Sequence, residues 1–196
     1  FGVYATIDSG KSWLKLGGGV PTISFRDIEV QERESDLVGA SFGRGFYVLD
    51  DYSALREMGE ETLGRDAALF PVKTALQYVP LRPIDSSGKN CFGETFFLAP
   101  NPPFGAVFSY YLRDGLKSGA EARKEAEAAL VKEGKPVPFP GWDVLRREER
   151  EVKPQVVLTV TDEAGQVVRR VSGPAGKGLH RVAWDLRYPP VEPTEL

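Results

Sequence analysis

The 196-residue sequence predicts a mainly β protein, in which the terminal blades of a β-propeller precede a β-sandwich with a helical insertion. Short β-prone runs separated by Gly- and Pro-rich turns indicate antiparallel sheets. A segment near the start recurs 43 residues later, which is close to the roughly 40–50 residues of a four-stranded propeller blade. Farther along, a hairpin with alternating apolar residues needs a second sheet to cover its apolar face, as in a β-sandwich.

The repeat consists of residues 2–8 (GVYATID) and 45–51 (GFYVLDD), which align without a gap. The sequence around and between the two copies predicts five short strands, over 2–7, 13–16, 25–30, 36–41 and 46–49. Alternation in the third run predicts Phe25, Asp27 and Glu29 on one face of its strand and Arg26, Ile28 and Val30 on the other. Residues 1–55 are therefore predicted to form terminal blades of a propeller.

The turn after the first copy carries a motif. Residues 6–13 (TIDSGKSW) fit the pattern Ser/Thr-x-Asp-x-Gly-x-Ser/Thr-Trp at every defined position. In such a turn Asp8 can accept backbone hydrogen bonds, Gly10 can take a positive φ, and Trp13 can anchor the hairpin by burial. We favour this structural role for Asp8 over contact with a ligand or a metal. The structural residues of the motif are then Thr6, Asp8, Gly10, Ser12 and Trp13.

The motif resembles the Asp box, or BNR repeat, of sialidases, sortilin-type receptors and related propellers. Residues 40–51 (ASFGRGFYVLDD) resemble the segment that ends the propeller in bacterial BNR-repeat proteins of the sortilin-like or glycosyl hydrolase kind. The resemblance implies a secreted or periplasmic protein. Because the sequence opens at Phe1 within a strand, we expect the C-terminal part of a longer chain. Arg44 could bind an anionic ligand in the central channel of the propeller. We favour the alternative, in which it bonds to carbonyl groups of a neighbouring blade.

Residues 56–73 are predicted to be a linker, with one short helix over 54–65 and an extended crossing at 69–71. Residues 74–196 are predicted to form the sandwich. Its strands are expected over 74–81, 105–113, 155–161, 166–171 and 178–186, and residues 162–165 form a hairpin turn. The BNR-repeat proteins that the sequence resembles carry such a sandwich after their propeller.

A helical insertion is predicted over residues 116–152. Ser118 and Glu121 have the spacing of a capping box, strong helix formers fill 122–131, and Gly134 with Pro136 ends the helix. A second helix is expected over 142–151. The first helix has only a thin apolar stripe, which predicts a surface position. The insertion could bind a partner or be decoration, and we favour decoration.

Composition excludes several kinds of site. The net charge of −3 and the pI near 5.4 give no reason to expect nucleic acid as a partner. No apolar run approaches the roughly 20 residues of a membrane span. Cys91 is the only cysteine and His180 the only histidine, which excludes an internal disulfide and a His-rich metal site. No motif for a cofactor is present, so none is expected.

No complete catalytic site is evident from the sequence. Glycoside hydrolysis needs two carboxylates, for which Asp50 and Asp51 are weak candidates, together with Asp27. We therefore expect a non-catalytic portion of a BNR-repeat propeller protein that binds a ligand or partner, such as a peptide or glycan, or has a structural role. The alternative is an accessory part of a sialidase-like hydrolase whose catalytic residues lie in further blades. The remaining blades, or another chain that supplies them, are the expected partners, and open strand edges predict self-association.

Overall fold

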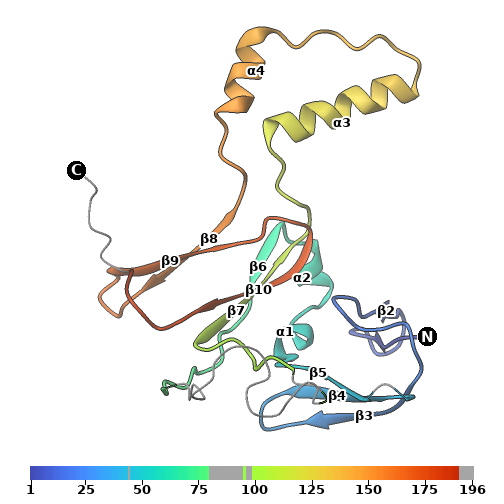
Figure 1. Ribbon diagram of the computed structural model, residues 1–196, viewed down its shortest axis with the longest axis vertical. Coiled ribbons are helices and arrows are strands. Elements are labelled where there is room, and N and C mark those ends of the chain that lie inside the picture. Colours follow the sequence, from blue (N-terminus) through green and yellow to red (C-terminus); the bar gives the residue numbers. More distant parts are fainter. Residues whose placement is uncertain (44, 80–94, 96–98, 190–196) are drawn as a thin grey trace. The chain divides into compact units, whose positions relative to one another are not determined.

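The computed structural model describes residues 1–43, 45–79, 95 and 99–189 (Figure 1). The protein is mainly β, with 31% of the described residues in strands and 18% in helices. Its sheets are small and antiparallel, and among the described residues none closes on itself. The chain divides into two compact units, one of Phe1–Gly64, Phe70–Phe108 and Ala183–Leu186, the other of Arg65–Leu69, Ser109–Val182 and Arg187–Leu196.

The first unit begins with a hairpin of two very short strands, β1 (Tyr4–Ala5) and β2 (Leu14–Lys15). They pair antiparallel around the predicted turn, with Ala5 opposite Leu14. Both strands are shorter than the runs 2–7 and 13–16 that the sequence predicts. Outside these pairs, the N–H of Gly2 bonds to the carbonyl of Ile23 and the N–H of Leu16 to that of Val3, so backbone bonding extends beyond the regular strands.

The strands β3 (Phe25–Gln31), β4 (Asp36–Ser41) and β5 (Gly45–Leu49) form an antiparallel meander in that order. These strands confirm the prediction for residues 25–49. The predicted alternation along β3 is wrong at one place, because the register shifts between Phe25 and Asp27. The Phe25 ring lies against Gly39 and meets the Tyr47 ring at 5.7 Å. Since Gly39 pairs with both Ile28 and Tyr47, the bulge turns Phe25 to the face of Ile28.

Two short helices, α1 (Ser53–Arg56) and α2 (Glu60–Gly64), replace the single helix expected over 54–65. They are followed by β6 (Ala67–Leu69), a strand within the range predicted as a linker. The predicted strand over 74–81 is wrong for residues 74–79, which form no strand. A strand needs a partner, and there Tyr78 instead packs its ring on Phe104, 5.0 Å away. Residues 80 and 81 lie outside the described residues.

The strand β7 (Ala106–Leu112) is the centre of a three-stranded antiparallel sheet, between β10 (Gly178–Trp184) and β6. It carries half of the described residues that are buried, among them Tyr110, which is 3% exposed. The Tyr110 hydroxyl donates a hydrogen bond of 2.6 Å to the carbonyl of Pro174. The side chain is thus buried with its polar end satisfied, and it anchors the chain that leads into β10.

The strands β8 (Val156–Thr161) and β9 (Val167–Gly173) form the predicted hairpin. Half-buried and exposed residues alternate along β8, as its sequence pattern predicts. In the turn, Asp162 accepts a hydrogen bond of 2.8 Å from the N–H of Gln166, and Gly165 has a φ of 79°. The turn 162–165 is thereby confirmed, with the glycine at the position that needs positive φ.

The predicted helical insertion is present as α3 (Gly119–Lys132) and α4 (Trp142–Glu149). The capping box of Ser118 and Glu121 forms with both of its hydrogen bonds, 3.2 Å and 2.9 Å long. No residue of either helix is buried, which confirms the predicted surface position of the first. Among the described residues, no helix has the length and apolarity to cross a bilayer.

Candidate functional site

The turn between β1 and β2, residues 6–13, brings together the predicted motif residues. Asp8 Oδ1 accepts hydrogen bonds from the Thr6 hydroxyl, at 2.8 Å, and from the N–H of Ser12, at 2.9 Å. Its Oδ2 accepts from the Ser12 hydroxyl at 2.5 Å. The N–H of Gly10, whose φ is 90°, donates to the Thr6 hydroxyl oxygen at 2.8 Å. The carboxylate of Asp8 is therefore directed at its own turn.

This bonding changes the acidity of Asp8. The hydrogen bonds from Ser12 and Thr6 lower the pKa of the Asp8 carboxyl from 3.8 to about 2. They favour the ionised form because each donor is lost as a partner when the oxygen carries a proton. The low pKa thus follows from donors within the turn, and it indicates that the ionised carboxylate holds this loop in shape.

Trp13 departs from its predicted role. We expected its ring to anchor the hairpin by burial, yet Trp13 is 61% exposed. The reason lies in the size of the sheet, because β1 and β2 have two residues each and pair only with each other among the described strands. A sheet this small offers little surface to cover an indole ring. The hydrogen bonds of Asp8, and not the burial of Trp13, hold the turn together.

Acidification is expected to weaken this turn. Because the folded pKa of Asp8 lies below its ordinary value, the carboxylate stabilises the turn above pH about 4. This contribution is lost as the pH falls toward 2, and Asp8→Asn should remove it at every pH. Amide hydrogen exchange at Ser12 reports the change directly. Exchange corrected for its intrinsic pH dependence should accelerate below pH 4 in the wild type and be pH-independent in Asp8→Asn; equal profiles would contradict this role.

The weak catalytic candidates Asp50 and Asp51 follow β5 and lead into α1. The N–H of Asp51 donates to Asp36 Oδ1 at 2.8 Å, and Asp51 Oδ1 accepts from the N–H of Ser53 at 3.2 Å. Asp51 has a φ of 44°, so its side chain serves a tight turn. The third acid that we considered, Asp27, lies on β3, where its Oδ1 accepts from the N–H of Ile28. These contacts tie the carboxylates of Asp51 and Asp27 to their own backbone segments.

Two predicted positions, Arg44 and Cys91, lie outside the described residues. His180 is on β10, where its Nε2 lies 2.6 Å from the carbonyl oxygen of Gly176. Since a carbonyl can only accept, Nε2 carries the proton. The imidazole also lies against the buried Tyr110 ring, with 5.3 Å between centroids. His180 thus has a packing role in the second unit.

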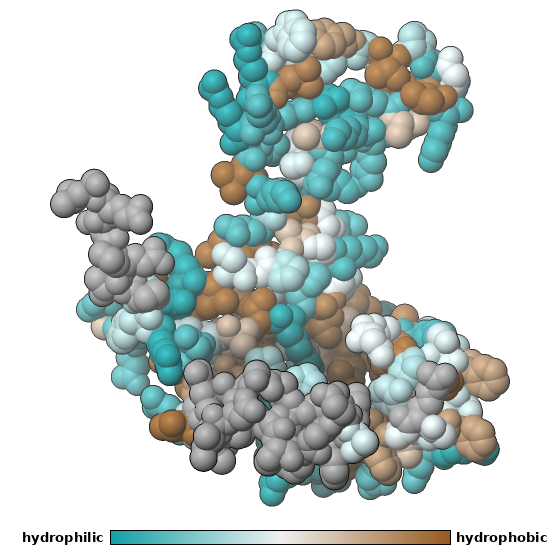
Figure 2. Space-filling view, viewed as in Figure 1, coloured by the Kyte–Doolittle hydropathy of each residue, from teal (hydrophilic) through white to brown (hydrophobic). Residues whose placement is uncertain are grey.

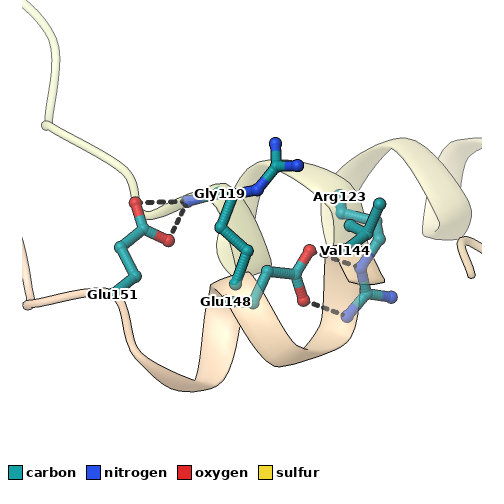
Figure 3. Close-up of a pocket in the computed structure, with 6 residues that line it drawn as sticks. Gly119, Arg123, Val144, Glu148 and Glu151 are labelled. Carbon is teal, nitrogen blue, oxygen red and sulfur yellow. Dashed lines mark hydrogen bonds and ion pairs between the residues drawn. The ribbon is translucent and has the colours of Figure 1, made fainter. Parts of the chain in front are cut away.

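A pocket of about 500 Å³, which no pattern in the sequence predicted, lies between α3 and α4 (Figure 3). Arg123 donates to both carboxylate oxygens of Glu148, at 2.7 and 2.8 Å, and to Glu127 at 2.6 Å. The N–H of Gly119, at the start of α3, donates to both oxygens of Glu151, at 2.8 and 3.0 Å. These bonds, named here the α3–α4 clamp, join the two helices without an apolar core.

The α3–α4 clamp also shifts the acidity of its members. The hydrogen bond that Arg123 donates lowers the pKa of Glu148, and the bonds that Arg123 donates to Glu148 and Glu127 raise its own pKa. The only local signal in the sequence was the pair of opposite charges Arg123 and Glu127, four residues apart on one helix. Because the pocket's Arg123, Glu148 and Glu151 bond within the clamp, they support a structural role for this site.

Among the described residues, no group of three or more His, Cys, Asp or Glu side chains could hold a metal ion. The one motif that is assembled, residues 6–13, is a turn whose carboxylate is satisfied by its own loop. Comparison with known proteins adds no assignment, since no family model, no curated protein and no solved structure matches this chain.

Proposed function

We propose that the chain is a non-catalytic portion of a BNR-repeat propeller protein, with a binding or structural role. The observation that carries the proposal is the bonding of Asp8, whose two oxygens accept three hydrogen bonds from its own turn. A carboxylate used in this way is a folding device and not a general acid, base or nucleophile. Such a device is what the Asp-box resemblance implies for this position.

The sheet β3–β4–β5 supports the propeller part of the proposal, because both of its faces present apolar side chains. On one face, Phe46 is 78% exposed and Val48 55%. On the other face, Ile28 and Val30 are also exposed. A sheet that faces water on one side is polar there, whereas a sheet with two apolar faces needs a layer on each. Stacked blades supply a sheet on either side.

The repeat also supports the propeller part of the proposal. Residues of β1 and β5 occupy equivalent places in the two copies, Tyr4 with Tyr47 and Ala5 with Val48. After β1 the chain turns at the motif and returns as β2, whereas after β5 it continues into α1. The second copy therefore lacks the returning strand, and the outer edge of β5 is the place where we propose that a further strand pairs.

Assay of the full chain on aryl-glycosides tests the non-catalytic proposal. Wild type, Asp50→Asn and Asp51→Asn should all give hydrolysis equal to the buffer blank, because the Asp51 carboxylate is engaged by its own turn. Turnover that falls in either variant would defeat the proposal and favour the hydrolase reading. Circular dichroism of each variant shows whether the fold is retained.

Self-association tests the proposal that both faces of the sheet are covered by other sheets. The isolated chain should dimerise in sedimentation velocity, because Phe46 and Val48 lie uncovered. Replacing both with lysine should shift the chain toward monomer. A matched control replaces Leu76 and Val79, which are also exposed but lie outside any strand, and should leave the distribution unchanged. A monomeric wild type would contradict the proposal.

A further inference from the structure

The loop that joins α3 to α4 has an unusual covalent pattern, Lys-Pro-Val-Pro-Phe-Pro over residues 135–140. A proline ring fixes its own φ near roughly −65° and has no N–H to donate. Its bulk also drives the preceding residue out of the helical region into the extended or polyproline II region. Every residue of this segment is a proline or precedes one, so its backbone is confined to an extended course. In the structure, residues 135–141 form neither helix nor strand.

The segment presents an apolar ridge. In polyproline II geometry, residues three apart lie on the same side, which groups Pro136 with Phe139. Trp142, the first residue of α4, follows after Gly141. The rings of Phe139 and Trp142 meet edge to face, with centroids 5.3 Å apart. Both rings remain open, with Phe139 63% and Trp142 68% exposed. We name Pro136, Phe139 and Trp142 the aromatic ridge.

The surroundings of the ridge add to its apolar character. Val131, at the end of α3, and Val137, in the loop, are also exposed. Figure 2 shows hydrophobic residues where this loop runs between the two helices, beside the largely hydrophilic side chains of the helices. Neither helix has a buried residue, so the insertion does not build a core. A cluster of exposed large apolar side chains on a polar element marks an interaction surface.

The α3–α4 clamp joins the start of α3 to the end of α4, at the helix ends remote from the loop. Arg123 donates two hydrogen bonds to Glu148, and Glu151 accepts from the first N–H of α3. The helices on either side of the loop are thereby joined to each other. A loop confined by its prolines loses little conformational freedom on binding. Such preorganisation raises affinity because less ordering entropy is lost.

The chemistry of the segment selects among the known ways in which proteins recognise peptides. Addition to a sheet edge requires successive N–H donors, which Pro136, Pro138 and Pro140 lack. Docking as an amphipathic helix requires helical backbone, which residues preceding proline disfavour. Recognition of a polyproline II segment by an aromatic-lined groove requires neither. We propose that the aromatic ridge is a recognition element for a partner protein that carries such a groove.

The inference is tested by binding of the full chain to an array of purified proline-binding domains. The array holds WW domains and Src-homology 3 domains. At least one domain should bind, and Phe139→Ala should weaken that binding about tenfold or more, as at an interface hot spot. Pro138→Ala, which frees the backbone and keeps the ridge, should weaken it several-fold. Phe42→Ala, at an equally exposed phenylalanine in the turn after β4, should bind like wild type.

Two results would overturn the inference. In one, no domain of the array binds wild type more tightly than Phe139→Ala. In the other, sedimentation shows a wild-type dimer that Phe139→Ala converts to monomer, which would make a second copy of the chain the occupant. Because Phe139 is exposed, the variant should fold, and thermal melts followed by circular dichroism verify this. The inference is independent of the proposed function, since it concerns α3, α4 and their loop alone.

Discussion

Replacing Gly105 with alanine is expected to destabilise the chain by more than about 3 kcal/mol, the upper end of overpacking effects. A Cβ at this position would lie 1.9 Å from the carbonyl oxygen of Trp184 and 2.8 Å from its carbonyl carbon. Both are backbone atoms of β10, so no side-chain rotation can relieve the contact. Gly105 also has a φ of 104°, where an L-residue is strained. The central strand β7 would have to move away from β10.

Gly178→Ala is the matched control for Gly105→Ala. Gly178 also stands at the start of a strand with positive φ, 115°, but a Cβ there meets no atom within 4 Å. It should lose about 1–2 kcal/mol from backbone strain alone. Urea unfolding followed by tryptophan fluorescence gives both losses. Equal losses at the two positions would show that strain dominates and that the close approach to Trp184 costs little.

The features that sequence reasoning predicted well are those decided within a few residues. The capping box at Ser118, the turn after Asp162 and the bonding of Asp8 each depend on groups no more than four positions apart. Their geometry follows from local backbone chemistry, whatever packs around them. Because the hydrogen-bond partners of Asp8 lie within its own motif, the structural role of this candidate site residue could be predicted from that motif.

The features that sequence reasoning missed are decided by distant contacts. The run at 74–79 has a strand-like pattern but forms no strand, whereas the three residues of β6 have no such pattern and pair with β7. The burial expected for Trp13 needs a covering layer that a two-residue hairpin does not provide. Likewise, no residue near Arg123 in the sequence indicates that it bonds to Glu148, which lies 25 residues away. Such pairings follow from tertiary structure, which overrides strand propensity.

The second large effect concerns the pair Gly173 and Tyr110. A Cβ at Gly173 would lie 2.3 Å from the Tyr110 hydroxyl oxygen and 3.0 Å from the ring carbon that carries it. Burial raises the pKa of Tyr110, and its hydroxyl donates to Pro174, so the ring cannot move without losing that bond. Gly173→Ala should therefore cost about 2–3 kcal/mol. Tyr110→Phe should cost about 1–2 kcal/mol, because the Pro174 carbonyl loses its donor.

A double-mutant cycle separates the two causes. If the new methyl group clashes with the Tyr110 hydroxyl, the losses should not add. The double variant Gly173→Ala with Tyr110→Phe should then lose at least about 1 kcal/mol less stability than the sum of the two single variants. The phenylalanine ring leaves the nearest atom at 3.0 Å in place of 2.3 Å, so a small adjustment then accommodates the methyl group. Additive losses in urea unfolding would mean that Gly173 is required for a reason other than Tyr110. Coupling would show that the absence of a side chain at Gly173 is what lets the buried tyrosine of β7 reach Pro174 and fasten the end of β9 to the sheet.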